Sequence, residues 1–120
     1  MLRRVGTVIA FVSDLAAAKA FYRDILGLKV RVDSPGWVEF ETEGATFALH
    51  PGVPPRPPGP IAEGPSLSVG FDVESVKKAY ATLVAKGVAF ERSPTPIAPG
   101  VWVANFRDRD GNELAISGPA

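Results

Sequence analysis

The chain contains an internal repeat, and this repeat constrains its fold more than any other feature. Residues 5–30 (VGTVIAFVSDLAAAKAFYRDILGLKV) and residues 66–90 (SLSVGFDVESVKKAYATLVAKGVAF) follow the same order. Each copy has a short apolar strand, an acidic or hydroxyl residue that can cap a helix, an amphipathic helix, and a glycine followed by an apolar residue. Repetition of a supersecondary unit predicts that each copy forms one module of the fold.

Both copies carry a clear helical pattern. In the first, Ser13 or Asp14 can cap the helix and Gly27 ends it; in the second, we expect Asp72 as the cap and Gly87 as the end. The apolar stripes at helical spacing are Leu15, Ala18, Phe21, Tyr22, Ile25 and Leu26, and then Val73, Val76, Tyr80, Leu83 and Val84. These stripes predict packing against a sheet, so the helices account for stability rather than function.

Segments of alternating polarity follow each helix. Residues 37–43 and 46–50 flank a turn at Gly44, and residues 101–106 and 112–117 flank the loop RDRDG. Each copy therefore reads as a βαβββ module of an α+β fold. We expect a single domain over residues 1–120, with a first module at 1–50, a proline-rich linker at 51–65 and a second module at 66–120.

Composition limits the possible partners and the compartment. Thirteen basic and thirteen acidic side chains give a formal net charge of zero, so we expect neither a nucleic-acid nor a membrane partner. The absence of cysteine excludes disulfides, thiolate metal sites and cysteine nucleophiles, and it suits a cytoplasmic protein. Ser13 and Asp14 interrupt the first apolar run before a signal peptide could develop, which favours the same location.

Four segments together resemble the vicinal oxygen chelate superfamily, which includes glyoxalase, bleomycin-resistance and extradiol-dioxygenase proteins. They are VSDLAAAKAFYRDILGLKV, GWVEFETEGATFALHPG, FDVESVKKAYATLVAKGV and FRDRDGNELAI. The resemblance implies a curved mixed sheet around a concave cleft formed by the two modules, and a homodimer. The loop RDRDGN resembles the family's DPDGN turn, with Arg109 in place of the proline.

In metal-dependent members of that family, four strand positions that face the cleft supply the metal ligands. The resemblance places those positions at Thr7, Ala48, Ser66 and Ala115. None is an imidazole or a carboxylate, and a chain with one histidine cannot form a site with two histidines and a carboxylate. An all-oxygen site from Glu39, Glu41 and Glu113 would need several converging oxygens. We therefore expect no bound metal and no other cofactor.

Strand alternation predicts which side chains face the cleft, because successive side chains point to opposite faces. The apolar parity, assigned to the helix-packed core, comprises Val8, Ala10, Val12, Val38, Phe40, Phe47, Leu49, Leu67, Val69, Phe71, Leu114 and Ile116. Aligning Gly111 with Gly44 places Trp102, Ala104 and Phe106 on the cleft side. The candidate ligand-binding residues are Thr7, Phe11, Trp37, Glu39, Ala48, His50, Ser66, Trp102, Phe106 and Ala115.

The candidate site combines aromatic and acidic side chains. Its aromatic rings could stack on a planar or cationic molecule, or could instead fill the face or pack against a second subunit. Glu39, Glu41 and Glu43 would favour a cationic ligand if they line the cleft, and otherwise form an ordinary solvated strand edge. His50 and Glu39 are weak catalytic candidates for proton transfer, although His50 could equally bond a carbonyl or water before Pro51.

Three functional hypotheses follow. We favour a metal-free protein of the glyoxalase and bleomycin-resistance type that binds a small aromatic or cationic organic molecule in its cleft. The alternative is a glyoxalase-like or dioxygenase-like enzyme, a lyase or oxidoreductase, that uses a relocated metal site or His50 with a glutamate. The third hypothesis is a structural or interaction module whose own tryptophans fill the cleft.

Overall fold

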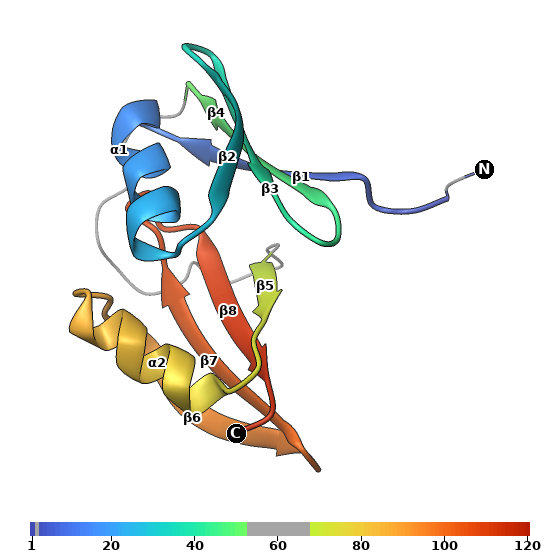
Figure 1. Ribbon diagram of the computed structural model, residues 1–120, viewed down its shortest axis with the longest axis vertical. Coiled ribbons are helices and arrows are strands. Elements are labelled where there is room, and N and C mark those ends of the chain that lie inside the picture. Colours follow the sequence, from blue (N-terminus) through green and yellow to red (C-terminus); the bar gives the residue numbers. More distant parts are fainter. Residues whose placement is uncertain (2, 53–67) are drawn as a thin grey trace. The chain divides into compact units, whose positions relative to one another are not determined.

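Each repeat folds into a βαβββ module with one four-stranded mixed sheet (Figure 1). The computed structural model describes residues 1, 3–52 and 68–120, and contacts divide the chain into two units, residues 1–57 and 58–120. The expected α+β class with two βαβββ modules is thereby confirmed. The predicted linker at residues 51–65 lies, apart from Pro51 and Gly52, outside the described residues.

The first unit contains β1 (Thr7–Val12), α1 (Leu15–Ala20), a π-helical turn η1 (Phe21–Ile25), β2 (Lys29–Ser34), β3 (Trp37–Glu41) and β4 (Thr46–Pro51). Its strand order is β1-β4-β3-β2, in which β1 and β4 run parallel and the other pairs run antiparallel. The second unit contains β5 (Ser68–Asp72), α2 (Val76–Ala85), β6 (Phe90–Ala98), β7 (Val101–Arg107) and β8 (Glu113–Gly118). Its strand order, β5-β8-β7-β6, repeats the same topology.

The first helix begins where the sequence predicts. Asp14 caps α1, because its Oδ1 accepts a hydrogen bond from the backbone N–H of Ala17 at 3.0 Å. The helix then widens into η1, where the N–H of Leu26 donates to the carbonyl of Phe21 at 3.1 Å. Gly27 ends the helix with a φ of 77°, a conformation that favours glycine.

The predicted cap of the second helix is wrong. Ser75, not Asp72, caps α2, and its Oγ accepts from the N–H of Lys78 at 3.2 Å. Asp72 is instead the last residue of β5, where it pairs with Ser117. The N–H of Val73 also donates to the carbonyl of Ser117 at 3.0 Å, so the chain leaves the sheet later than the acidic residue indicates.

Alternation correctly predicts the helix-packed face of the first sheet. Tyr22 on η1 is fully buried, and its ring centroid lies 5.7 Å from that of Phe40 and 5.0 Å from that of Phe47. The other buried side chains of this face are Ala10, Val12, Val38 and Leu49, while Val8 is half-buried. Because the helix covers this face, the alternate residues of the strands lie on the opposite one.

In the second sheet, alternation fails on β7. Leu114 and Ile116 are buried as expected, but they pair with Phe106 and Ala104, which share the helix-packed face. The predicted cleft-side position of Trp102, Ala104 and Phe106 is therefore wrong. The cause is the loop between β7 and β8. In the first sheet Phe40 pairs with Phe47, whereas in the second Phe106 pairs with Leu114, so the β7–β8 connection is one residue longer than the β3–β4 connection. This extra residue reverses the side-chain facing that the alignment of Gly111 with Gly44 predicts.

The helices are short. Within residues 1, 3–52 and 68–120, none is long and apolar enough to cross a membrane.

Candidate functional site

The candidate site lies on the face of the first sheet opposite α1, which we call the open face. It is formed by the alternate residues of three strands: Thr7, Ile9 and Phe11 of β1, Thr46, Ala48 and His50 of β4, and Trp37, Glu39 and Glu41 of β3. These side chains include six of the ten candidate ligand-binding residues. The structure thus brings most of the predicted site together within one unit.

Three rings form a row across one end of the open face. Phe11 pairs with His50 on the neighbouring strand, and their ring centroids lie 5.6 Å apart. The ring of Trp37 lies 6.4 Å from that of His50 in an edge-on arrangement. Phe11 is 47% exposed, His50 is exposed and Trp37 is half-buried. This aromatic row, Phe11, His50 and Trp37, offers a planar molecule several rings on which to stack.

His50 is held by its own strand end. Its Nδ1 is at hydrogen-bonding distance from the carbonyl oxygen of Pro51. A carbonyl can only accept, so Nδ1 carries the proton and Nε2 is the nitrogen left to act as an acceptor in the neutral ring. The bond to a carbonyl at the strand end, which the sequence left open, is therefore present.

Glu39 is the centre of a polar network beside the aromatic row. Its Oε1 accepts a hydrogen bond from the indole Nε1 of Trp37 at 2.9 Å, and its Oε2 accepts from Nη2 and Nε of Arg31 at 2.8 and 3.1 Å. Arg31 Nη2 also donates to Oγ1 of Thr46 at 2.9 Å. The hydrogen bond from Trp37, followed by that from Arg31, lowers the pKa of Glu39 below the ordinary glutamate value. The carboxylate therefore stays ionised at neutral pH and is a poor proton acceptor.

Arg31 is a residue of the candidate site that the sequence did not indicate. It lies on β2, between Val30, which pairs with Phe40, and Val32, which pairs with Glu39, at a shift in strand register. The segment KVRVD alternates charged and apolar residues, a pattern typical of a strand, and this signal could have located β2. The register shift itself has no such signal.

The positions that the family resemblance assigns to metal ligands do not fit a metal site. Thr7 offers one hydroxyl and is exposed; Ala48 is fully buried between Ile9 and Glu39 and offers no donor atom. Ala115, 8% exposed, lies in the second unit between Gly70 and Asn105, and Ser66 lies outside the described residues. In the described part of the chain, no group of three or more His, Cys, Asp or Glu side chains converges in a way that could hold a metal.

The remaining candidates, Trp102 and Phe106, belong to the helix-packed side of the second sheet. Phe106 is 1% exposed, and its ring centroid lies 5.0 Å from that of Phe90. The ammonium of Lys77 on α2 lies 4.5 Å from the centre of the Trp102 ring, a cation–π contact. These two aromatic residues therefore act in packing within this unit.

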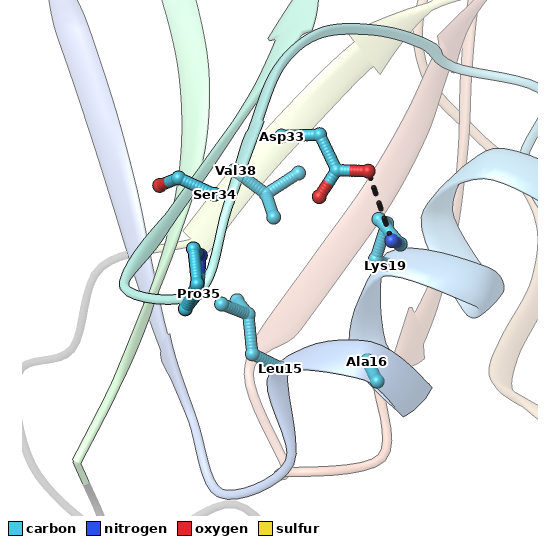
Figure 2. Close-up of a pocket in the computed structure, with 7 residues that line it drawn as sticks. All are labelled: Leu15, Ala16, Lys19, Asp33, Ser34, Pro35 and Val38. Atoms are coloured by element: carbon cyan, nitrogen blue, oxygen red, sulfur yellow. Dashed lines mark hydrogen bonds and ion pairs between the residues drawn. The ribbon is translucent and has the colours of Figure 1, made fainter.

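A separate hollow of about 400 Å³ lies on the other side of the first sheet, beside α1. Its lining residues are Leu15, Ala16, Lys19, Asp33, Ser34, Pro35 and Val38. Figure 2 shows Leu15 extending from the helix toward Pro35, with an ion pair of 3.0 Å between Lys19 and Asp33 at one side. Because Lys19 and Asp33 are paired with each other, the hollow presents mainly apolar surface, and sequence reasoning did not anticipate it.

Comparisons with known proteins agree with the fold and the resemblance. YetH of Bacillus subtilis (strain 168) is 29% identical over 121 residues, covering 97% of this chain and 98% of YetH. The crystal structure of TnmS3, an antibiotic binding protein from Streptomyces sp. CB03234, is 29% identical with a TM-score of 0.76, covering 99% of this chain and 98% of that one. A glyoxalase/bleomycin resistance protein/dioxygenase from Nocardioides is 26% identical with a TM-score of 0.72, covering 99% and 85%. A family model matches residues 4–116, and the chain thus belongs to the Glyoxalase/Bleomycin resistance protein/Dioxygenase superfamily.

Proposed function

We propose that the protein binds a small aromatic organic molecule, without a metal, on the open face of its first unit. The observation that carries this proposal is the partly exposed aromatic row of Phe11, His50 and Trp37. Aromatic side chains with a few fixed polar groups are the usual lining of a small-molecule site. TnmS3, at 29% identity over nearly the full length of both chains, is an antibiotic binding protein, which favours a binding role within this superfamily.

The two tryptophans provide a direct test, because one lies in the proposed site and the other packs under Lys77. Trp102→Phe leaves Trp37 as the only tryptophan, and Trp37→Phe leaves Trp102. Titration with planar aromatic compounds, corrected against free tryptophan, should quench the first variant saturably and the second hardly at all. Equal responses of the two variants, or no saturable response in either, would contradict the proposal.

Metal-free binding is tested separately. Of the positions that the family resemblance assigns to metal ligands, those that the structure describes are Thr7, Ala48 and Ala115. They offer one hydroxyl and two methyl groups, so we expect no tight binding of Ni²⁺, Zn²⁺, Mn²⁺ or Fe²⁺. The measurement is elemental analysis of purified protein after incubation with each ion and gel filtration. A stoichiometric, tightly held ion would overturn this part of the proposal.

The same geometry weighs against the alternative of acid–base catalysis by His50 and Glu39. Both oxygens of Glu39 accept hydrogen bonds from Trp37 and Arg31, and its pKa is lowered, so it has little tendency to take a proton. His50 directs its Nδ1 to the Pro51 carbonyl rather than to a carboxylate. A binding role needs neither residue to change its protonation state.

The proposal extends to a homodimer acting in the cytoplasm. The absence of cysteine suits a reducing compartment, and the open face carries exposed apolar side chains, Ile9 at 42% and Phe11 at 47%. Light scattering after gel filtration tests the assembly: a mass near 25 kDa, about twice the chain's 12.7 kDa, supports a dimer, and the monomer mass would refute it.

A further inference from the structure

We infer that the open face selects uncharged or anionic planar aromatic molecules over cationic ones, and that Arg31 is the residue that determines this selectivity. The inference rests on the proposed function, since it names the class of ligand that the aromatic row would bind. It reverses the preference that three glutamates near the site indicate in the sequence.

The acidic row does not present free negative charge. Oε2 of Glu39 lies 2.8 Å from Nη2 of Arg31, and Oε2 of Glu41 lies 3.5 Å from Nζ of Lys29. Glu43 lies beyond the end of β3, in the exposed turn that leads to β4. The two glutamates on the strand are therefore each paired with a cation from β2, and the face is close to electrically neutral.

The position of Arg31 follows from the register shift of β2. Val30 pairs with Phe40 and Val32 pairs with Glu39, so Arg31 is an extra residue opposite no partner of its own on β3. Its guanidinium reaches past Glu39 to Oγ1 of Thr46 on β4. This places the guanidinium on the open face, next to the carboxylate that accepts from Trp37.

Arg31 retains donor capacity after these contacts. Its Nε and Nη2 are occupied by Glu39 and Thr46, while its Nη1 has no hydrogen-bond partner among the residues that the structure describes. A guanidinium fixed in this way can donate to an oxygen of a ligand and can also stack on an aromatic plane. A cationic ligand would instead be repelled by Arg31, and Glu39 would attract it little, because the charge of Glu39 is already compensated by Arg31.

The expected effect is moderate, because the side chain of Arg31 is 45% exposed and that of Glu39 is 23% exposed. Charges that are partly exposed to water interact weakly, so the removal of one charge beside the ligand should change the dissociation constant by about five- to tenfold. The effect should also decrease at high salt.

Three tricyclic probes of similar shape separate charge from stacking: 9-anthracenecarboxylate as the anion, acridone as the uncharged probe and 9-aminoacridine as the cation. Dissociation constants are measured by probe fluorescence at low salt for the wild type, Arg31→Gln and Lys29→Gln. Lys29→Gln is the matched control, because it removes the same charge from the same strand at a side chain that is 80% exposed and whose pairing to Glu41 is longer.

The wild type should bind the anion and the uncharged probe more tightly than the cation. Arg31→Gln should weaken the anion and strengthen the cation, each by about fivefold or more, whereas Lys29→Gln should change each by less than twofold. A wild-type preference for the cation, or equal shifts in the two variants, would overturn this inference and leave the proposed function standing. Failure of the wild type to bind any of the three probes would overturn both.

Discussion

Replacement of Phe106 and of Phe11 by alanine should affect stability very differently, and this contrast tests which face each ring occupies. Phe106 is 1% exposed and packs against Phe90 at 5.0 Å between centroids, on the helix-packed side of the second sheet. Truncation of a buried phenylalanine costs about 3–5 kcal/mol, because the lost transfer energy and the remaining cavity add. Phe11 is 47% exposed, so its truncation removes only about half of the burial of a phenylalanine side chain and should cost about 1 kcal/mol in the free energy of unfolding.

Urea denaturation followed by circular dichroism measures both changes. With a denaturant slope of about 1.5 kcal/mol per M, Phe106→Ala should lower the midpoint by about 2 M or more and Phe11→Ala by less than about 0.7 M. A loss of 3–5 kcal/mol approaches the total stability of many domains, so Phe106→Leu provides a milder variant, with an expected cost of about 1 kcal/mol.

Ligand affinity should change in the opposite order. Phe11→Ala should weaken the binding of acridone, because it removes a ring from the aromatic row, and Phe106→Leu should leave binding unchanged. Equal stability losses in the two alanine variants would refute the assignment of Phe106 to the core. Loss of acridone binding in a folded Phe106→Leu protein would restore that residue to the ligand site.

Two further variants test polar contacts. Asp108→Ala should lower the free energy of unfolding by about 2–3 kcal/mol, because the Asp108 carboxylate accepts from the N–H groups of Asp110 and Asn112, both at 2.9 Å. Asp108→Asn should cost about half of that. If urea denaturation shows no difference between the two variants, that would count against the hydrogen bonds. Glu39→Gln should lower the urea midpoint at pH 7, and the difference from wild type should shrink as the pH falls below about 4. The reason is that the pKa of Glu39 is lowered in the folded state, so the stability that the ionised carboxylate contributes is lost as the carboxylate becomes protonated. A difference that stays constant from pH 7 to pH 3 would show that the carboxylate is not held by these bonds.

The loop before β8 shows how far the repeat could be used for prediction. The repeat predicts both modules, the order of elements within each and the helix ends at Gly27 and Gly87, because these depend on local patterns that both copies keep. Side-chain facing depends on exact register, and one added residue in a hairpin connection reverses it. Asp108 organises the longer loop through the N–H groups of Asp110 and Asn112, and Asn112 Nδ2 donates to it at 2.8 Å. Nothing in the alternation of β7 alone distinguishes the two registers, since Trp102 and Val103 are both apolar.

The same limit explains why the charge of the site could not be predicted. Alternation places Glu39 on the open face correctly, but alternation cannot assign Arg31, because the extra residue at the register shift has no fixed partner. Only the folded strand shows that the guanidinium is hydrogen-bonded to the Glu39 carboxylate. The sequence thus shows which acidic residues are present but not which of them form ion pairs, and the ligand that a site prefers depends on the charge that these ion pairs leave uncompensated. For this open face, the pairing of Glu39 with Arg31 and of Glu41 with Lys29 compensates the acidic charge that favoured a cation among the expected ligands, and this is why we infer an uncharged or anionic ring system.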